Sequence, residues 1–244
     1  VLCITKFSMA HSKARKDFSK YGGRYLSMPG YSKKMLLNEA LKANFIKLDK
    51  NTSKLSNILT NGKKCLIKSD DGTCLHADLK NRVSNSCPGH VLKKGSLGSP
   101  PDIESNISPI ESKSNGLLVI NGSIANDKIG LLKNPVYLRL EKGKIKKIKS
   151  KSTKVKKFLE RTFKKFGHKS RILGEIGIGL NKKSKLTGNM LTDEGAYGCI
   201  HFGFGSNFSV GGKNKVNFHL DFVTKKHSLF VDNKLIIKKG RIVI

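Results

Sequence analysis

The chain has 244 residues, of which 37% are hydrophobic and 27% charged, and its formal net charge at pH 7 is +31. This length allows one large domain or two small ones with a real core, and the hydrophobic content excludes a disordered chain. No run approaches 18 apolar residues and the N-terminal VLCIT is too short for a signal peptide, so we expect a cytoplasmic protein without membrane contact.

The excess of basic residues raises the possibility of nucleic-acid binding. The segment 142–171 holds 14 Lys or Arg against the single acidic residue Glu160. Only seven of the 48 basic residues are arginine, however, and no aromatic residues interleave at strand spacing. We therefore interpret this segment as a solvated helix face and a basic hairpin, and nucleic acid as a possible but not a favoured partner.

Residues 1–60 are predicted to form a partial α/β domain. VLCIT reads as a strand, a helix follows with Ser8 as its N-cap and Gly22 as its end, and GRYLSMPG reads as a second strand. This order is typical of a βαβ unit in a parallel sheet, to which we expect further strands ahead of Val1 to belong. A helical region then covers MLLNEALKANFIKL and SKLSNILTN.

Residues 61–244 are predicted to form a β-rich α+β catalytic domain that binds metal. Alternating runs on either side of a DDGT turn indicate a hairpin, and residues 83–115 read as a long loop. A helix over 152–166 is expected to be capped by Ser152 and ended by Gly167, with strands before it and after residue 172. The five cysteines lack CxxC spacing, which favours reduced thiols.

The scarce acidic residues and the histidines of the last third suggest a metal site. His219 and Asp221 stand two apart in a predicted strand, so their side chains share a face, and imidazole with carboxylate suits Zn, Mn, Co or Fe(II). A chance surface pair is the alternative. Glu175 lies among apolar residues and glycines and needs a cation as a partner, while His201 lies between glycines that leave room for a ligand.

The run GEIGIGLNKKSKLTGNMLTDEGAYGCIHFGFGSNFSVGG, followed by HLD and a closing hairpin, resembles the aminopeptidase T family of leucyl aminopeptidases. That metallopeptidase family is similar in turn to an iron-dependent dihydroxypyridine ring-cleaving dioxygenase. SMAHSKARKDFSKYGGRYLSMPG, GTCLHADLKNR and SPPDIESNISPIES resemble further segments of the family, so the resemblance covers nearly the whole chain.

The resemblance implies a homodimer that hydrolyses peptides with two divalent ions, Zn, Co or Mn, and with Glu175 as a catalytic base. The ligands it implies are Glu104, Glu175, His201, His219 and Asp221. Ile103 replaces a glycine that is usual before the first of these, so Glu111 is its alternate. Phe208 stands near the position of the family's tyrosine and cannot donate a hydrogen bond, and Gly195 replaces a usual lysine.

These observations give three hypotheses for function. The leading one is a metal-dependent aminopeptidase that releases N-terminal residues from peptides through a water activated by two metals. The second is a mononuclear Fe(II) ring-cleaving dioxygenase that uses His201, His219 and Asp221. The third is a non-enzymatic basic protein that binds nucleic acid or other polyanions, and whose binding weakens steeply with salt.

Overall fold

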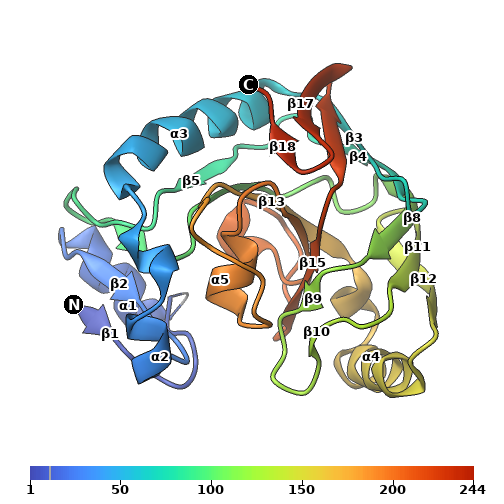
Figure 1. Ribbon diagram of the computed structural model, residues 1–244, viewed down its shortest axis with the longest axis horizontal. Coiled ribbons are helices and arrows are strands. Elements are labelled where there is room, and N and C mark those ends of the chain that lie inside the picture. The colour runs from blue at the N-terminus through green and yellow to red at the C-terminus, as the bar shows by residue number, and fades with distance from the viewer. Residues whose placement is uncertain (11) are drawn as a thin grey trace.

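The computed structural model describes residues 1–10 and 12–244, in which a small N-terminal α/β layer lies beside a larger body of antiparallel sheets (Figure 1). The α-helices of this part are α1 (Lys13–Lys20), α2 (Lys33–Leu36), α3 (Phe45–Asn61), α4 (Thr153–Phe166) and α5 (Met190–Glu194). Short 3-10 helices cover Glu39–Lys42, His168–Arg171 and Phe208–Val210. Among the described residues, no helix has the length and apolarity that a membrane crossing needs.

The N-terminal layer contains the predicted βαβ unit. Strands β1 (Leu2–Cys3) and β2 (Tyr25–Ser27) pair in parallel, and α1 connects them. The helix begins later than predicted, because the Ser12 side chain accepts the amide of Arg15 whereas Ser8 accepts that of Ala10. The predicted helix also included His11, which lies outside the described residues. A third parallel strand, β6 (Leu97–Gly98), pairs with β2, so the sheet extends beyond residue 60, and the division into domains at that residue stays a prediction.

The helical region after residue 30 is interrupted. The side chains of Asn38 and Asn44 accept the backbone amides of Ala40 and Lys47, and each thereby starts a new helix. Asparagine competes for backbone donors in this way, so the predicted continuous helix over 35–48 is wrong. The long helix α3 runs from Phe45 to Asn61, and Leu55 and Leu59 on it join the hydrophobic core.

A seven-stranded antiparallel sheet forms the centre of the larger body. Its strands, in spatial order, are β10 (Gly130–Leu131), β9 (Ser123–Ile124), β15 (His219–Thr224), β14 (Ile200–Gly205), β13 (Leu173–Gly179), β7 (Glu104–Ile107) and β5 (Asn85–Cys87). Two of these strands, β5 and β7, lie in the segment 83–115, where we predicted a loop, and so does β6 of the N-terminal sheet. The loop prediction is wrong. The mostly polar sequence of β7 gives no signal of a buried strand, although all four of its residues are buried.

An eight-stranded antiparallel sheet shares the hydrophobic core with the central sheet. Its strands, in spatial order, are β12 (Lys144–Ser150), β11 (Val136–Glu141), β8 (Ser114–Ile120), β4 (Cys74–Asp78), β3 (Lys64–Lys68), β16 (Ser228–Val231), β17 (Lys234–Lys238) and β18 (Arg241–Ile242). The predicted DDGT hairpin is β3 with β4. The fold is therefore a mixed α/β fold rich in sheet, as the sequence predicted at that level.

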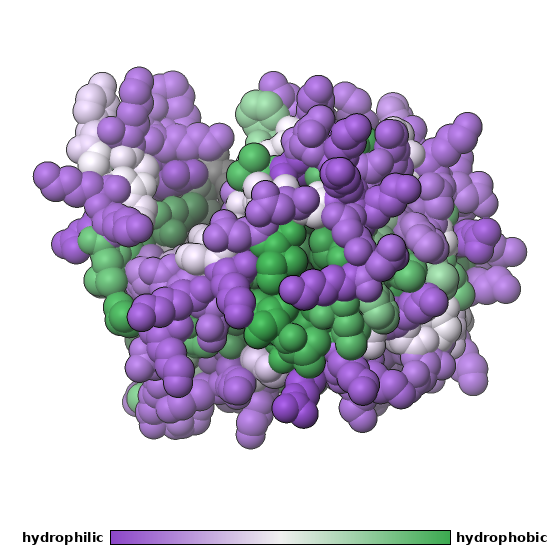
Figure 2. Space-filling model, turned by 90° about the horizontal axis from the view of Figure 1, so that it is seen from above, coloured by the Kyte–Doolittle hydropathy of each residue, from purple (hydrophilic) through white to green (hydrophobic). Residues whose placement is uncertain are grey.

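Helix α4 confirms its sequence prediction. The Ser152 side chain accepts the amide of Val155, and Gly167 with φ of 73° ends the helix. Val155 and Phe163 face the core, whereas the lysines between them point to solvent. Hydrophilic side chains also cover most of the face in Figure 2, around a central apolar patch. Nucleic acid stays a possible but not a favoured partner of this basic segment.

The five free cysteines differ in burial, which predicts an order of reactivity. Cys74 is exposed, whereas burial raises the pKa of Cys65 to about 12 and that of Cys199 to about 11, and raises the pKa of Cys87 well above its usual value. Because the thiolate is the nucleophile, a maleimide at pH 8 should label Cys74 in the native protein and these three only after denaturation. Mass spectrometry of the labelled peptides checks this, and rapid native labelling of Cys65 would contradict the packing described.

Candidate metal centre

Four neighbouring strands of the central sheet carry the candidate ligands. Glu104 lies on β7, Glu175 on β13, His201 on β14, and His219 with Asp221 on β15. The register places Glu175 opposite Gly203 and Gly203 opposite Asp221. Since side chains alternate between the faces of a strand, all five residues share one face. The structure thus gathers, from segments more than 100 residues apart in the sequence, every residue predicted as a ligand.

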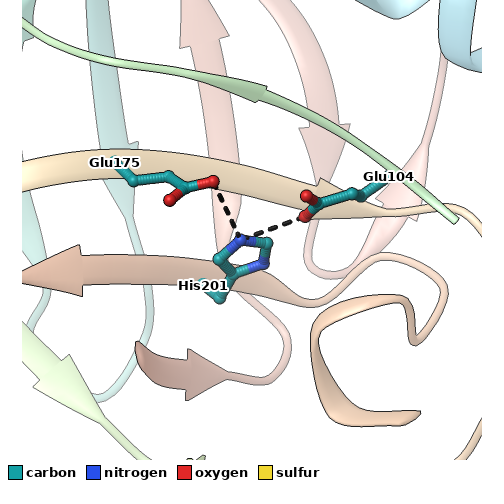
Figure 3. A group of neighbouring side chains, drawn as sticks. All are labelled: Glu104, Glu175 and His201. Carbon is teal, nitrogen blue, oxygen red and sulfur yellow. Dashed lines mark ion pairs between the residues drawn. The ribbon is translucent and has the colours of Figure 1, made fainter. Parts of the chain in front are cut away.

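These side chains form two clusters that share Glu175. In the first cluster, Nε2 of His201 lies 3.0 Å from Oε2 of Glu104 and 3.9 Å from Oε1 of Glu175 (Figure 3). In the second, Nε2 of His219 lies 3.3 Å from Oε2 of Glu175 and 3.0 Å from Oδ1 of Asp221. Within each cluster the ligand atoms all lie within 4.8 Å of one another, which suits three donors around one cation.

Glycines on the same face make the room for these clusters. A Cβ atom at Gly177 would lie 2.1 Å from Cε1 of the His201 ring, and one at Gly203 would lie 2.6 Å from Nε2 of His219. Both glycines have room for a hydrogen only, so no other residue fits without moving a ligand. The alternating glycines of GEIGIG and IHFGFG therefore belong to the site rather than to a phosphate-binding loop.

Burial and mutual charge dominate the electrostatics of the site. Burial alone would lower the pKa of His201, but Glu104 and Glu175 raise it to about 10, and burial raises the pKa of Glu104 to about 7. Burial would also lower the pKa of His219, but Asp221 raises it well above the usual value. Against burial, hydrogen bonds from both imidazoles hold the pKa of Glu175 below its ordinary range. The site thus balances carboxylates with protons on its histidines.

The donor set fits a divalent cation. Oε2 of Glu104 is buried and has no aligned hydrogen-bond donor in the described part of the chain, although Nε2 of His201 lies near it. Nδ1 of His219 donates to the carbonyl of Ser206 at 2.7 Å, which leaves Nε2 facing the two carboxylates. A hydrogen bond from the other ring nitrogen to a backbone carbonyl is typical of metal-binding histidines, because it fixes the orientation of the ring. The cofactor prediction therefore holds at the level of a divalent metal.

Asparagines support the first cluster from β7 and β5. Nδ2 of Asn106 donates to Oε1 of Glu104 at 2.7 Å, and Nδ2 of Asn85 donates to Oδ1 of Asn106 at 2.8 Å. These two hydrogen bonds in series fix one carboxylate oxygen of Glu104 and leave the other facing His201. The support explains why β7 is polar and buried at once.

Sequence reasoning missed two acidic residues near the centre. Asp102 and Glu194 are buried, and each has one oxygen without a hydrogen-bond partner among the described residues. Burial raises the pKa of both well above the usual carboxyl range, and nearby carboxylates, Glu104 among them, raise it further. The signal that could have found them is the scarcity of acidic residues: of the 17 in the chain, Asp102 stands two residues before Glu104, and Glu194 stands in the DEG run.

The alternate ligand Glu111 lies elsewhere, so that interpretation is wrong. Its carboxylate accepts hydrogen bonds from Arg82, from Asn207 and from the amide of Lys213. These three partners of Glu111 lie outside both clusters. Because Arg82 balances the charge of Glu111, this carboxylate is not available to bind a cation. Phe208, near the position of the tyrosine expected of a peptidase, is 53% exposed and has Nζ of Lys215 over its ring.

We predict that metal binding releases protons and tightens as pH rises. The pKa of His201 is raised to about 10 and that of His219 well above its usual value, so both rings carry protons at pH 7 without metal. A metal needs the bare Nε2, so each histidine that binds gives up about one proton. Calorimetry in buffers of different ionisation enthalpy measures this number. Binding at pH 7 without proton release would contradict the electrostatics described.

The arrangement defines a class of site, a group of histidines and carboxylates on an antiparallel sheet that could hold a metal ion. The model of the NicX family, 2,5-dihydroxypyridine 5,6-dioxygenase, matches residues 1–244, and the chain belongs to this family. A relative from Pseudomonas putida KT2440, 2,5-dihydroxypyridine 5,6-dioxygenase, is 24% identical over 257 residues, which cover 99% of this chain and 71% of that protein.

Two solved structures share the fold. The 2,5-dihydroxypyridine dioxygenase from Pseudomonas putida KT2440 superposes with a TM-score of 0.84 at 24% identity, covering 99% of this chain and 71% of the other. Wild-type AmpT from Thermus thermophilus superposes with a TM-score of 0.65 at 16% identity, covering 84% of this chain and 57% of the other. The resemblance to aminopeptidases is thus a distant likeness of fold.

These comparisons correct the leading functional prediction. The metallo-aminopeptidase, with the hydrolase and protease classes attached to it, is wrong, because the family and the relative are dioxygenases. The chain is expected to be an enzyme, but an oxidoreductase, which was the second hypothesis. The resemblance of the run that begins with GEIGIG and of the HLD motif favoured the peptidase. Two residues argued against it: Phe208, near the position of the family's tyrosine, and Gly195, in place of a usual lysine.

Proposed function

We propose that the chain is an Fe(II)-dependent dioxygenase that opens the ring of a dihydroxypyridine. The observation that carries the proposal is the match of the dioxygenase family over all 244 residues, together with the convergence of Glu175, His219 and Asp221 within 4.8 Å. The printed name of the relative supplies the substrate class, a pyridine with hydroxyls at positions 2 and 5, opened between carbons 5 and 6.

The iron is proposed to be held by Glu175, His219 and Asp221. The side chain of His219 is 33% exposed, whereas those of His201 and Glu104 are almost fully buried, so this cluster is the one that a substrate and dioxygen can reach. This proposed ligand set differs from that of the second hypothesis, which used His201, His219 and Asp221. The difference arises because His201 lies in the other cluster, with Glu104 and Glu175. Fe(II), when bound, supplies the one-electron chemistry that lets dioxygen react with an aromatic ring.

The residues of this chain would then divide the work. His219 keeps Nδ1–H on the carbonyl of Ser206, so its Nε2 would be free to hold the iron. A proton on Nε2 of His201 balances Glu104, which lies 3.0 Å away, and so reserves the charge of Glu175 for the metal. The buried first cluster would keep water from the inner side of the site, and the ring of the substrate would approach past His219, whose side chain is the exposed one.

Oxygen uptake tests the proposal. The chain is loaded with Fe(II) without air and mixed with 2,5-dihydroxypyridine in oxygenated buffer, with Zn(II)-loaded protein as the control. We expect about one dioxygen consumed per substrate with Fe(II) and none with Zn(II). A folded, Fe(II)-loaded chain that consumes no oxygen with any dihydroxypyridine isomer would overturn the proposal.

A further inference from the structure

Asn207 is a fully buried polar side chain in the segment that joins β14 to β15. Its Nδ2 donates to Oγ of Ser108 and to Oε1 of Glu111, each at 2.9 Å, and its Oδ1 accepts the amide of Asn214 at 2.7 Å. The amide group therefore uses both donors and its carbonyl. Such a satisfied buried network fixes one conformation of the loop.

The neighbour of Asn207 in sequence holds a candidate ligand. The carbonyl of Ser206 accepts Nδ1–H of His219 at 2.7 Å, and the amide of Ser206 donates to the carbonyl of Phe218 at 2.7 Å. Both bonds depend on where the backbone at residues 206 and 207 lies. A shift of Asn207 would therefore rotate or release the imidazole of His219.

Asn207 also packs against the strand that carries Glu175. A Cβ atom at Gly174 would lie 2.9 Å from Cβ of Asn207, so the two residues are in close contact. Gly174 directly precedes Glu175, at the point where the pairing of β13 with β14 shifts register. Gly212 closes the other side, since a Cβ atom there would lie 2.0 Å from Cγ of Asn207. Asn207 thus contacts Gly174, the neighbour of Glu175, and directly follows Ser206, whose carbonyl holds His219.

Glu111 holds Asn207 in turn. Besides Asn207, its carboxylate accepts the amide of Lys213 at 2.6 Å and a hydrogen bond from the guanidinium of Arg82, whose Nη1 donates to the carbonyl of Gly211 at 2.8 Å. These bonds attach both halves of the loop 206–214 to the segment just after β7. The ion pair is partly buried, so removing one partner leaves the other unbalanced.

We propose that Asn207 is a positioning residue that sets His219 and Glu175 for the metal, and that Glu111 holds Asn207 in place. The inference rests on the proposed function only in requiring that a divalent metal binds at the second cluster. Its test measures metal binding rather than turnover, so it can fail while the dioxygenase proposal stands.

The test is Co(II) binding by calorimetry and visible absorption, on wild type, Asn207→Ala and Glu111→Gln. Loss of a group that holds a metal ligand in place typically weakens metal binding about 10- to 100-fold, and we expect a loss in this range for Asn207→Ala. The Co(II) absorption bands should also change shape, because the geometry at His219 changes. Glu111→Gln keeps the shape of the side chain and should give a smaller loss in the same direction.

Asn121→Ala is the matched control. Asn121 also braces a loop, through bonds to Asp71 and to the backbone of Lys225, but none of these partners belongs to either cluster. It should leave Co(II) affinity and spectrum unchanged. The proposal is overturned if folded Asn207→Ala binds Co(II) with wild-type affinity and spectrum. If that variant does not fold, unchanged binding by Glu111→Gln overturns it instead.

Discussion

His219→Ala is expected to abolish tight Fe(II) binding and to lower turnover of dihydroxypyridine to background. The imidazole is the one nitrogen donor in the cluster with Glu175 and Asp221, and without it two carboxylates face each other unbalanced. Loss of several kcal/mol of metal binding corresponds to at least about a 10³-fold weaker Kd. Anaerobic titration with Fe(II), followed by oxygen uptake, measures both effects.

The control for this variant is His76→Ala. His76 lies exposed on β4, in the other sheet, and has no part in either cluster. It should bind Fe(II) and turn over substrate as wild type does. Iron binding by His219→Ala within about threefold of wild type would contradict the assignment of the second cluster as the iron site.

Gly203→Ala is expected to damage the site without touching a ligand. The added methyl would lie 2.6 Å from Nε2 of His219 and 2.9 Å from Oδ1 of Asp221, both far inside van der Waals contact. The ligands must move, so we expect metal affinity to fall at least about 10- to 100-fold. Overpacking of this kind also lowers the free energy of unfolding by about 1–3 kcal/mol. Calorimetry with Co(II) and denaturant unfolding separate the two effects.

Gly62→Ala separates crowding at the site from crowding elsewhere. Its methyl would lie 2.4 Å from Cγ1 of Val231, in the eight-stranded sheet. This variant should lose a similar free energy of unfolding and keep its metal affinity. Equal losses of metal affinity in Gly62→Ala and Gly203→Ala would show that general destabilisation, not the gap at Gly203, governs binding.

Local patterns in the sequence predicted much of the fold. Helix α4 combines a serine N-cap, one apolar face and a terminal glycine, and these signals act within a few residues. The hairpin of β3 and β4 has its turn residues between alternating runs. Strand β7 could not be found in this way, because Glu104, Ser105 and Asn106 are polar. They are buried through bonds to α3 and within the site, which only the tertiary structure supplies.

The candidate site was predictable in part. His219 and Asp221 share a face because of their spacing alone, and the apolar and glycine surroundings of Glu175 and His201 pointed to these two residues. The resemblance to a family added Glu104 and made the five residues a set of ligands. The grouping of these five into two clusters could not be predicted, since it depends on the register between four strands. The same holds for Asp102, Glu194 and Asn207, whose roles arise from burial and from partners distant in the sequence.

The measurement that tests the account most directly is incorporation of labelled oxygen. Fe(II)-loaded chain is incubated with 2,5-dihydroxypyridine under ¹⁸O₂, and the product is analysed by mass spectrometry. A dioxygenase of this family places both atoms of dioxygen in the ring-opened product, so we expect a mass increase of two labelled oxygens. A ring-opened product that carries no ¹⁸O, or an intact ring after full loading with iron, would contradict the account.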